Sequence, residues 1–287
     1  MKIYIDGKFF SEEEAKISVF DHGLLYGDGI FEGLRFYNGA LFCLEEHIDR
    51  LYQSAQAILL KIPLTHTQLQ QAVIETVHRN DLSDGYVRLI VTRGKGSLGL
   101  NPESCPQASI IIIVAKIKLY PQESYEKGLH VITCSTRRVT HGAFSPMVKS
   151  LNYLNNVMAK IEAAQAGAGE GLMLNEQGLV AECTGDNIFV VKHGEVFTPP
   201  TSSGALAGIT RAVVIKMARA FDLIVHEKEM TRYDIYTGDE CFLTGTAAEI
   251  IPVASLDQRV IGDGNPGKIT QQLMSEFQKV IRKKLKG

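Results

Sequence analysis

Two loop segments combine small residues and hydroxyl groups in a way that suits anion binding. The first, residues 202–210, follows a strand and leads into an expected helix that begins near 211. Unpaired backbone N–H groups at a helix start, together with the Thr210 hydroxyl, bind phosphate or carboxylate groups well. In the second, an apolar strand runs into residues 244–249, whose small side chains let a ligand approach the backbone. Taken singly, each segment also fits an ordinary Ser/Thr helix cap.

Lys149 and Glu182 are the next residues whose type and surroundings favour chemistry. Lys149 stands beside Val148, and apolar neighbours lower the pKa of a lysine, which makes its amine nucleophilic. Glu182 lies where an apolar strand meets a polar turn. Considered one at a time, a surface lysine and a solvated acid are the simpler interpretations. The helix expected after Lys149 has an apolar face formed by Leu154, Val157, Met158 and Ile161.

In combination, these groups match the needs of one cofactor, pyridoxal phosphate. A lysine forms its Schiff base, a phosphate cradle anchors it, and a buried acid keeps its pyridine nitrogen protonated as an electron sink. The sequence therefore predicts that Lys149, Glu182 and the loop ending at Thr210 contribute to one site.

Composition and missing motifs argue against several other classes of function. The 30 Lys and Arg residues nearly balance the 32 Asp and Glu residues, so nothing favours binding to nucleic acid or an anionic membrane. The longest apolar run, 110–115, is far shorter than the ~20 residues that span a bilayer. No metal-binding, P-loop, dinucleotide or G-x-S-x-G motif is present. Five scattered cysteines fit reduced thiols in the cytoplasm.

The order of expected elements indicates an α+β chain with two domains. A polar segment with a proline, 120–128, predicts a linker between a domain at 1–119 and another at 129–287. Thr65 or Thr67 is the expected cap of the second helix. The expected elements are strands around a tight turn over 19–35, helices over 45–60 and 65–80, strands over 86–91 and 109–118, and helices near 152–167, 210–221 and 267–284.

A long pattern of spaced residues resembles the signature of the class IV (fold type IV) pyridoxal-phosphate aminotransferases, most closely the branched-chain amino-acid aminotransferases. The resemblance extends over essentially the whole chain. It implies a small N-terminal α/β sandwich and a larger C-terminal pseudo-barrel with the cofactor between them. It also implies a homodimer or higher homo-oligomer, with partner residues at the pocket rim. The residues that carry it are Glu182, Thr184, 187–189, 196–198, 206–211, 46–51 and 149–152.

The resemblance implies a role for each matching position. Lys149 is similar to the lysine that forms the Schiff base and later moves a proton between Cα and C4′. Glu182 resembles the partner of the pyridine nitrogen, and Tyr153 resembles the hydroxyl near the phenolic oxygen. Helical periodicity alone predicts that the Arg50 side chain is exposed to solvent, because Arg50 falls opposite the apolar stripe of its helix. Only the resemblance implies that Arg50 is a ligand. The phosphate ligands implied are Arg50, Ile209, Thr210 and Thr246, with Leu206 and Gly208 shaping the ring pocket.

Other segments resemble the branched-chain subgroup. Tyr26 and Phe31 would wall an apolar pocket, and Arg88 would serve carboxylates, including that of 2-oxoglutarate. The expected function is therefore a ping-pong transamination that moves the amino group of L-leucine, L-isoleucine or L-valine to 2-oxoglutarate, with small amino acids and 2-oxo acids as the partners. The substrate-binding residues implied are Tyr26, Phe31, Arg35, Arg88, Gly245, Thr246 and Ala247.

Three alternatives stay open at this point. D-amino-acid aminotransferases share the pattern at 149–152, but they usually carry a tyrosine where Phe31 stands. Aminodeoxychorismate lyase chemistry is disfavoured by Thr246 and the alanines that follow it. A binding protein without activity is disfavoured because Lys149 and Glu182 are both present. Thr136 stands where branched-chain enzymes often have an aromatic residue, which leaves part of the side-chain pocket undefined.

Overall fold

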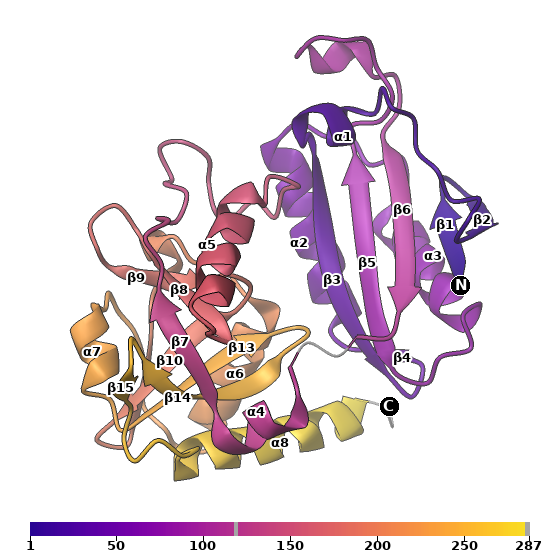
Figure 1. Ribbon diagram of the computed structural model, residues 1–287. Coiled ribbons are helices and arrows are strands. Elements are labelled where there is room, and N and C mark those ends of the chain that lie inside the picture. The colour runs from indigo at the N-terminus through magenta and orange to yellow at the C-terminus, as the bar shows by residue number, and fades with distance from the viewer. Residues whose placement is uncertain (118–119, 285–287) are drawn as a thin grey trace. The chain divides into compact units, whose positions relative to one another are not determined.

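The computed structural model describes residues 1–117 and 120–284, which form two compact units (Figure 1). The first unit consists of residues 1–117 together with Val148–Asn152. The second consists of residues 120–147 and 153–284. The expected boundary at 119 and the end of the strand expected over 109–118 lie outside the described residues.

The first unit is built on a six-stranded antiparallel sheet in the order β2-β1-β6-β5-β3-β4. Its three longest strands are central, and two of them, β5 and β6, are rich in Val, Ile and Leu, which suits burial. The strands expected over 86–91 and 109–118 correspond to β5 and β6. The strands are β1 (Lys2–Ile5), β2 (Lys8–Ser11), β3 (Gly29–Tyr37), β4 (Ala40–Leu41), β5 (Gly85–Thr92) and β6 (Ser109–Ala115).

Two amphipathic helices, α2 (Leu44–Ala57) and α3 (His66–His78), cover one face of this sheet (Figure 1). Their apolar sides, for example Leu51 and Val73, share one core with Leu34 and Leu89 of the sheet. Both helices confirm the sequence prediction. Thr65 caps α3 through a capping box with Gln68, as expected for a Thr at that position.

The glycine-rich segment 19–35 differs from its prediction as strands around a tight turn. Only its second part is a strand, β3, and its first part forms the short helix α1 (His22–Tyr26). Asp21 caps this helix through Gly23 N, and Gly27 ends it in the left-handed conformation. These two cap residues set the helical turn, a local signal that apolar alternation does not contain.

Val148–Asn152 adds a short extended segment beside β3. Phe31 N donates to Lys149 O at 2.9 Å, and Leu151 N donates to Gly29 O at 2.9 Å. Lys149 N also donates to the Ser54 hydroxyl on α2 at 3.2 Å. The backbone of Lys149 is therefore held by both the sheet and a helix of the first unit.

The second unit is built on a nine-stranded sheet in the order β12-β11-β10-β13-β14-β7-β8-β9, with β15 beside β14. Most neighbours are antiparallel, but β7 pairs in parallel with β8 and β14, and β11 with β12. The strands are β7 (Leu129–Thr133), β8 (Glu170–Leu174), β9 (Val180–Cys183), β10 (Asn187–Lys192), β11 (Glu195–Thr198), β12 (Val225–Glu227), β13 (Glu240–Gly245), β14 (Glu249–Leu256) and β15 (Arg259–Val260).

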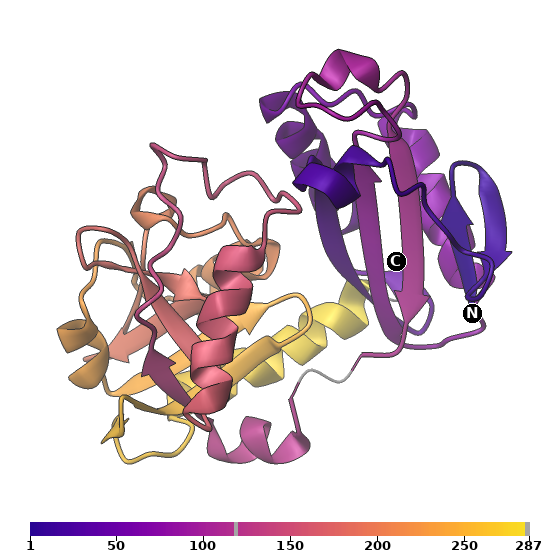
Figure 2. The same ribbon diagram turned by 45° about the horizontal axis from the view of Figure 1, so that its top comes forward.

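This sheet curls into a half-barrel, as the pseudo-barrel prediction requires. The edge strand β9 is joined to β10, near the opposite edge, by a turn of only three residues, 184–186. Cys183 N donates to Asp186 O across that turn at 2.8 Å. A turn this short can join the two strands only if the sheet bends back on itself, and Figure 2 shows the curled strands.

Helices surround the half-barrel and confirm the expected helical segments of the second unit. The segment 120–128, predicted as a linker, contains α4, and its residues Tyr120 and Tyr125 pack in the second unit's core. The helices are α4 (Gln122–Lys127), α5 (Leu154–Gln165), α6 (Ile209–Ala220), α7 (Arg232–Tyr236) and α8 (Lys268–Lys284). The described helices include none long and apolar enough to cross a membrane.

The face of α5 that packs is not the expected one. Leu154 is 71% exposed and Val157 is 48% exposed, and Met158 and Ile161 are also exposed. Instead, Asn156, Ala159 and Ala163 face the interior. Small residues let the helix lie close to β8, so its larger apolar side chains remain at the surface of this chain.

Candidate active site

In the first unit, Lys149 lies against an aromatic ring. Its Nζ is 4.5 Å from the centroid of the Phe31 ring, and that ring is buried. Arg88 of β5 also approaches the ring, with its Cζ 4.5 Å from the centroid. The predicted catalytic lysine and the predicted carboxylate-binding arginine therefore share one aromatic side chain, and each contact is a cation–π interaction.

Arg50, on α2, is held by a buried carboxylate of β3. Its Nε donates to Glu32 Oε1 at 2.7 Å, and its Nη2 donates to Oε2 at 2.8 Å. His47 Nδ1 also lies 2.7 Å from Oε2. This two-point pairing fixes the plane of the guanidinium, so the arginine that periodicity leaves in solvent is only 11% exposed.

The charges of this cluster follow from burial and pairing. Burial alone would raise the pKa of the Glu32 carboxyl, but Arg50 and His47 outweigh it and lower that pKa to about 2. Burial also lowers the pKa of the His47 imidazole. A neutral His47 beside a carboxylate carries its proton on Nδ1, because the carboxylate can only accept. The cluster is thus an Arg⁺–Glu⁻ pair steadied by a neutral histidine.

The remaining predicted substrate residues of the first unit lie on neighbouring elements. Tyr26, on α1, is exposed, and its hydroxyl accepts a hydrogen bond from Gly99 N at 2.9 Å. Arg35, on β3, has its guanidinium 5.0 Å from the centroid of the Tyr37 ring. Residues of β3 alternate between the two sheet faces, so Phe31 and Arg35 share a face.

In the second unit, Glu182 is a buried carboxylate surrounded by donors. Arg138 Nη2 lies 2.7 Å from Oε1, and both side chains are buried. Asn187 Nδ2 and Leu206 N each donate to Oε2 at 3.0 Å. These contacts stabilise a negative charge at Glu182, which is what a partner of a protonated ring nitrogen needs. The burial expected for this acid is confirmed.

Helix α6 begins at Gly208 in the manner of an anion-binding helix. Gly208 is its N-cap, and no side chain of the described residues caps the first turn. A Cβ at this position would lie 1.9 Å from Asn187 Oδ1, so glycine leaves room for the side chain that also binds Glu182. Ile209 and Thr210 form the first turn, where backbone N–H groups point outward.

The second predicted loop is the turn that joins β13 to β14. Gly245 ends β13, and Thr246 and Ala247 form the turn. A Cβ at Gly245 would lie 1.9 Å from Asp186 Oδ1. The adjacent residues Asp186 and Asn187 thus each require a glycine, one in each loop that the sequence predicts to bind an anion.

Asp186 belongs to a buried polar network that the sequence does not reveal. Tyr120 OH donates to Asp186 Oδ2 at 3.1 Å and lies 3.0 Å from Glu170 Oε2. Lys160 donates to the same Glu170 oxygen at 2.8 Å. Burial first, and then the Glu170 charge, raises the pKa of Asp186 to about 7. This pKa places the loss of the Asp186 proton near neutral pH.

The structure brings the predicted residues together in two groups. Lys149, Phe31 and Arg88 meet in the first unit, where Glu32 also orients Arg50. Glu182, Leu206 and Gly208 meet around Asn187 in the second. Tyr153 is the N-cap of α5. Sequence reasoning did not predict Glu32, His47 and Arg138 as supporting groups, although the family-like segments 26–35 and 46–51 include Glu32 and His47.

Comparison with known proteins identifies the family. The family model for amino-transferase class IV matches residues 29–256, which is most of the chain. This chain belongs to the class IV aminotransferases, a family that uses pyridoxal phosphate. The fold is that of fold type IV branched-chain aminotransferases, as expected.

Individual relatives agree with that assignment. A Methanocaldococcus jannaschii protein with a provisional branched-chain-amino-acid aminotransferase name is 50% identical over 283 residues, covering 99% of this chain and 97% of its own. The T.th. branched-chain amino acid aminotransferase, solved with N-(5'-phosphopyridoxyl)-L-glutamate, has a TM-score of 0.93 and 36% identity, with 99% of this chain and 94% of that chain covered. A D-alanine aminotransferase of Bacillus licheniformis is 35% identical, covering 98% of this chain and 97% of its own.

Proposed function

We propose that this protein is a branched-chain amino-acid transaminase that uses pyridoxal 5'-phosphate. The observation that carries the proposal is the buried Glu182 carboxylate with its three donors, because such an arrangement keeps a negative charge available for a protonated ring nitrogen. The residues present fit the cofactor: Lys149 offers an amine, and the start of α6 lacks a capping side chain among the described residues. When bound, the cofactor supplies an electron sink for a carbanion at Cα.

In this proposal each side chain has a defined task. Glu182 holds the proton on the pyridine nitrogen, and Arg138 and Asn187 keep its charge in place. Arg50, oriented by Glu32, binds the phosphate together with the first turn of α6 and the Thr246 turn. Leu206 and Gly208 shape the ring pocket, and Tyr153 donates to the phenolic oxygen.

Lys149 has two tasks, attachment of the cofactor and transfer of a proton. Its ε-amine takes the Cα proton of the amino donor and returns it at C4′, as a general base and then a general acid. The Phe31 ring limits where the amine can move. Hydrolysis releases a 2-oxo acid, and the reverse sequence with 2-oxoglutarate completes ping-pong turnover.

The substrate assignment rests on the surroundings of Phe31. A buried aromatic ring suits an aliphatic side chain, and a cation beside it suits the carboxylate of glutamate or 2-oxoglutarate. We assign Phe31 and Tyr26 to the apolar wall, and Arg88, Arg35 and the turn 245–247 to carboxylate groups. The relative solved with a phosphopyridoxyl-glutamate ligand supports a site that accepts both kinds of side chain.

A donor panel tests the function. The purified protein is given L-leucine, L-isoleucine, L-valine and D-alanine separately with 2-oxoglutarate, and glutamate formation is measured together with the chirality of that glutamate. We expect turnover with the three L-amino acids and L-glutamate as the product. The D-alanine arm is included because a D-alanine aminotransferase is among the relatives, and turnover confined to it would overturn the L-specific assignment.

We also propose a homodimer or larger homo-oligomer. The support is the exposed apolar face of α5, formed by Leu154, Val157, Met158 and Ile161, because a contiguous apolar helix face is usually covered by another surface. Light scattering coupled to size-exclusion chromatography should give at least twice 31.6 kDa. A monomer at micromolar concentration would contradict the proposal.

We also propose that the protein works in a reducing compartment such as the cytoplasm. The support is that four of the five free cysteines are buried.

A further inference from the structure

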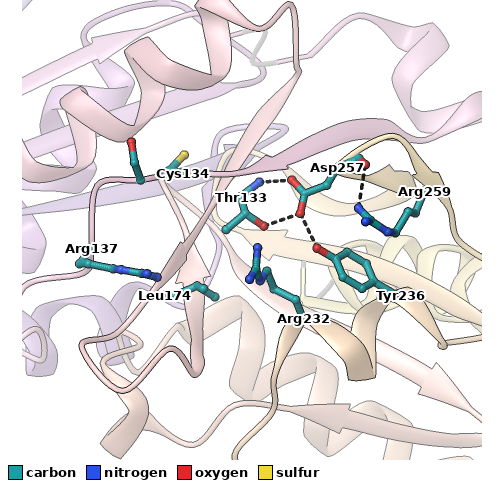
Figure 3. A pocket seen from close by; sticks show the side chains of 9 residues that line it. Thr133, Cys134, Arg137, Leu174, Arg232, Tyr236, Asp257 and Arg259 are labelled. Carbon is teal, nitrogen blue, oxygen red and sulfur yellow. Dashed lines mark hydrogen bonds between the residues drawn. The ribbon is translucent and has the colours of Figure 1, made fainter.

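A pocket on the second unit is lined by three arginines that have no place in the proposed transamination. It has a volume of about 520 Å³ and lies among Thr133, Arg137, Leu174, Arg232, Tyr236 and Arg259 (Figure 3). Small-molecule sites typically measure about 300–1,000 Å³, so this one can hold a small organic ligand.

The charges of this pocket are unbalanced. Among the described residues, neither the Arg137 nor the Arg232 side chain forms a hydrogen bond or ion pair with a carboxylate. Arg259 stacks its guanidinium on the Tyr236 ring, 4.6 Å from the centroid. Figure 3 shows Arg137 and Arg232 reaching toward one another from opposite sides, with Leu174 below them. Like charges repel, so an arrangement of this kind favours an anion between them.

The one acidic residue that lines the pocket is engaged in its wall. Asp257 accepts hydrogen bonds from Thr133 N at 2.6 Å, from the Thr133 hydroxyl at 2.7 Å and from Tyr236 OH at 2.6 Å. These contacts join β7, α7 and the turn after β14. The carboxylate lies near enough to Arg232 for that charge to help lower its pKa, but within the described chain the two side chains form no ion pair. Asp257 therefore braces the pocket and offsets the arginine charges only in part.

The neighbouring acid is engaged in the same way. Glu162, on α5, accepts from the backbone N–H groups of Ser135 at 2.6 Å and Thr136 at 3.0 Å, and from both hydroxyls. The segment that carries Arg137 is thus held at Thr133, Ser135 and Thr136. A fixed backbone lowers the entropy cost of presenting the arginine to a ligand.

We propose that this pocket binds a small organic molecule with two anionic groups, one contacted by Arg137 and the other by Arg232, with Arg259 at the rim. Guanidinium groups bind phosphate and carboxylate oxygens in two-point contacts, so both kinds of dianion share the required chemistry. Arg138, the neighbour of Arg137, is buried against Glu182, so successive residues of this segment serve different sites.

Calorimetry on the cofactor-loaded protein tests this site with two probes, pyrophosphate and succinate, at fixed ionic strength. We expect saturable binding of at least one probe, and the stronger probe identifies phosphate-type or carboxylate-type ligands. Arg137→Gln and Arg232→Gln should each weaken binding about tenfold or more, because each removes a charged hydrogen-bond donor.

Arg282→Gln is the matched control, since it removes an equal charge from an exposed position on α8. It should leave probe binding unchanged, and all three variants should keep the wild-type rate of amino transfer. Absence of saturable binding for both probes overturns the proposal. Binding that Arg137→Gln and Arg232→Gln leave intact also overturns it, because the probe then occupies a different site.

Discussion

The Nζ of Lys149 lies 4.5 Å from the centroid of the Phe31 ring, and the Phe31 backbone N–H donates to Lys149 O at 2.9 Å. One residue of β3 thus holds both the main chain and the side-chain amine of the lysine. A reactive lysine on a flexible stem loses much of its rate advantage unless its amine is held near the reacting carbon. The pairing of these residues supplies that restriction.

Replacing Lys149 by alanine should abolish turnover, because in the proposed mechanism its amine takes the Cα proton. Borohydride reduction followed by peptide mapping should place the cofactor label on Lys149 in the wild-type protein. Lys228→Ala is a matched control, since its Nζ lies 4.6 Å from the centroid of the Phe197 ring. That variant should retain activity, and a label on any other residue would contradict the assignment.

Glu182→Gln should lower kcat by roughly 10²–10³, the usual cost of removing one preorganised charge from a reaction centre. The fold should persist, because the glutamine oxygen can still accept from Leu206 N and Asn187. Circular dichroism and kcat are the two measurements. Glu195→Gln, which removes a half-buried carboxylate paired with His226, is the control and should leave kcat near wild type. Unchanged turnover in Glu182→Gln would mean that another group supplies the ring proton.

The glycines of the two loops give a steric test. Gly208→Ala and Gly245→Ala each place a methyl group 1.9 Å from the Asn187 or Asp186 side chain. Each should reduce the free energy of unfolding by about 1–3 kcal/mol, the usual cost of overpacking, and weaken cofactor binding. The control is Gly185→Ala, in the turn between β9 and β10 that also carries Asp186, where an added Cβ meets no atom within 4 Å. Equal effects at all three glycines would contradict this explanation.

Asp186 should give stability a distinct pH dependence. Burial and Glu170 raise its pKa in the folded protein to about 7, from 3.8. The folded state then binds the proton more tightly than the unfolded state, so this contribution to stability is complete below about pH 4 and is lost as the pH rises to about 7. The slope for one group is about 1.4 kcal/mol per pH unit.

Asp186→Asn removes this dependence. Urea unfolding gives the free energy of unfolding of the variant and of wild type at pH 5 and at pH 8. The difference, variant minus wild type, should be larger at pH 8 than at pH 5. Asp239→Asn, on an exposed residue, should run parallel to wild type. A parallel curve for Asp186→Asn would show that this carboxyl is not the titrating group.

Much of this protein can be predicted from its sequence because the relevant signals are local. Helical periodicity identifies α2, α3 and α6, and apolar runs identify β5 and β6. The Thr65 capping box also follows from residue types and spacing alone. The long family signature predicts the roles of Lys149 and Glu182, because each role is inferred from the position of the residue in that pattern.

Only the tertiary structure determines which partners these residues have. The β3 strand brings Glu32 to Arg50, and the β7-β8-β9 order of the second sheet brings Arg138 to Glu182, each across a separation that no sequence period encodes. The α5 face shows the limit most clearly: periodicity identifies Leu154 and Val157 as apolar neighbours, but small residues on the opposite side allow closer packing against β8. Which face a helix buries depends on the surface it meets, and that surface forms only when distant strands assemble.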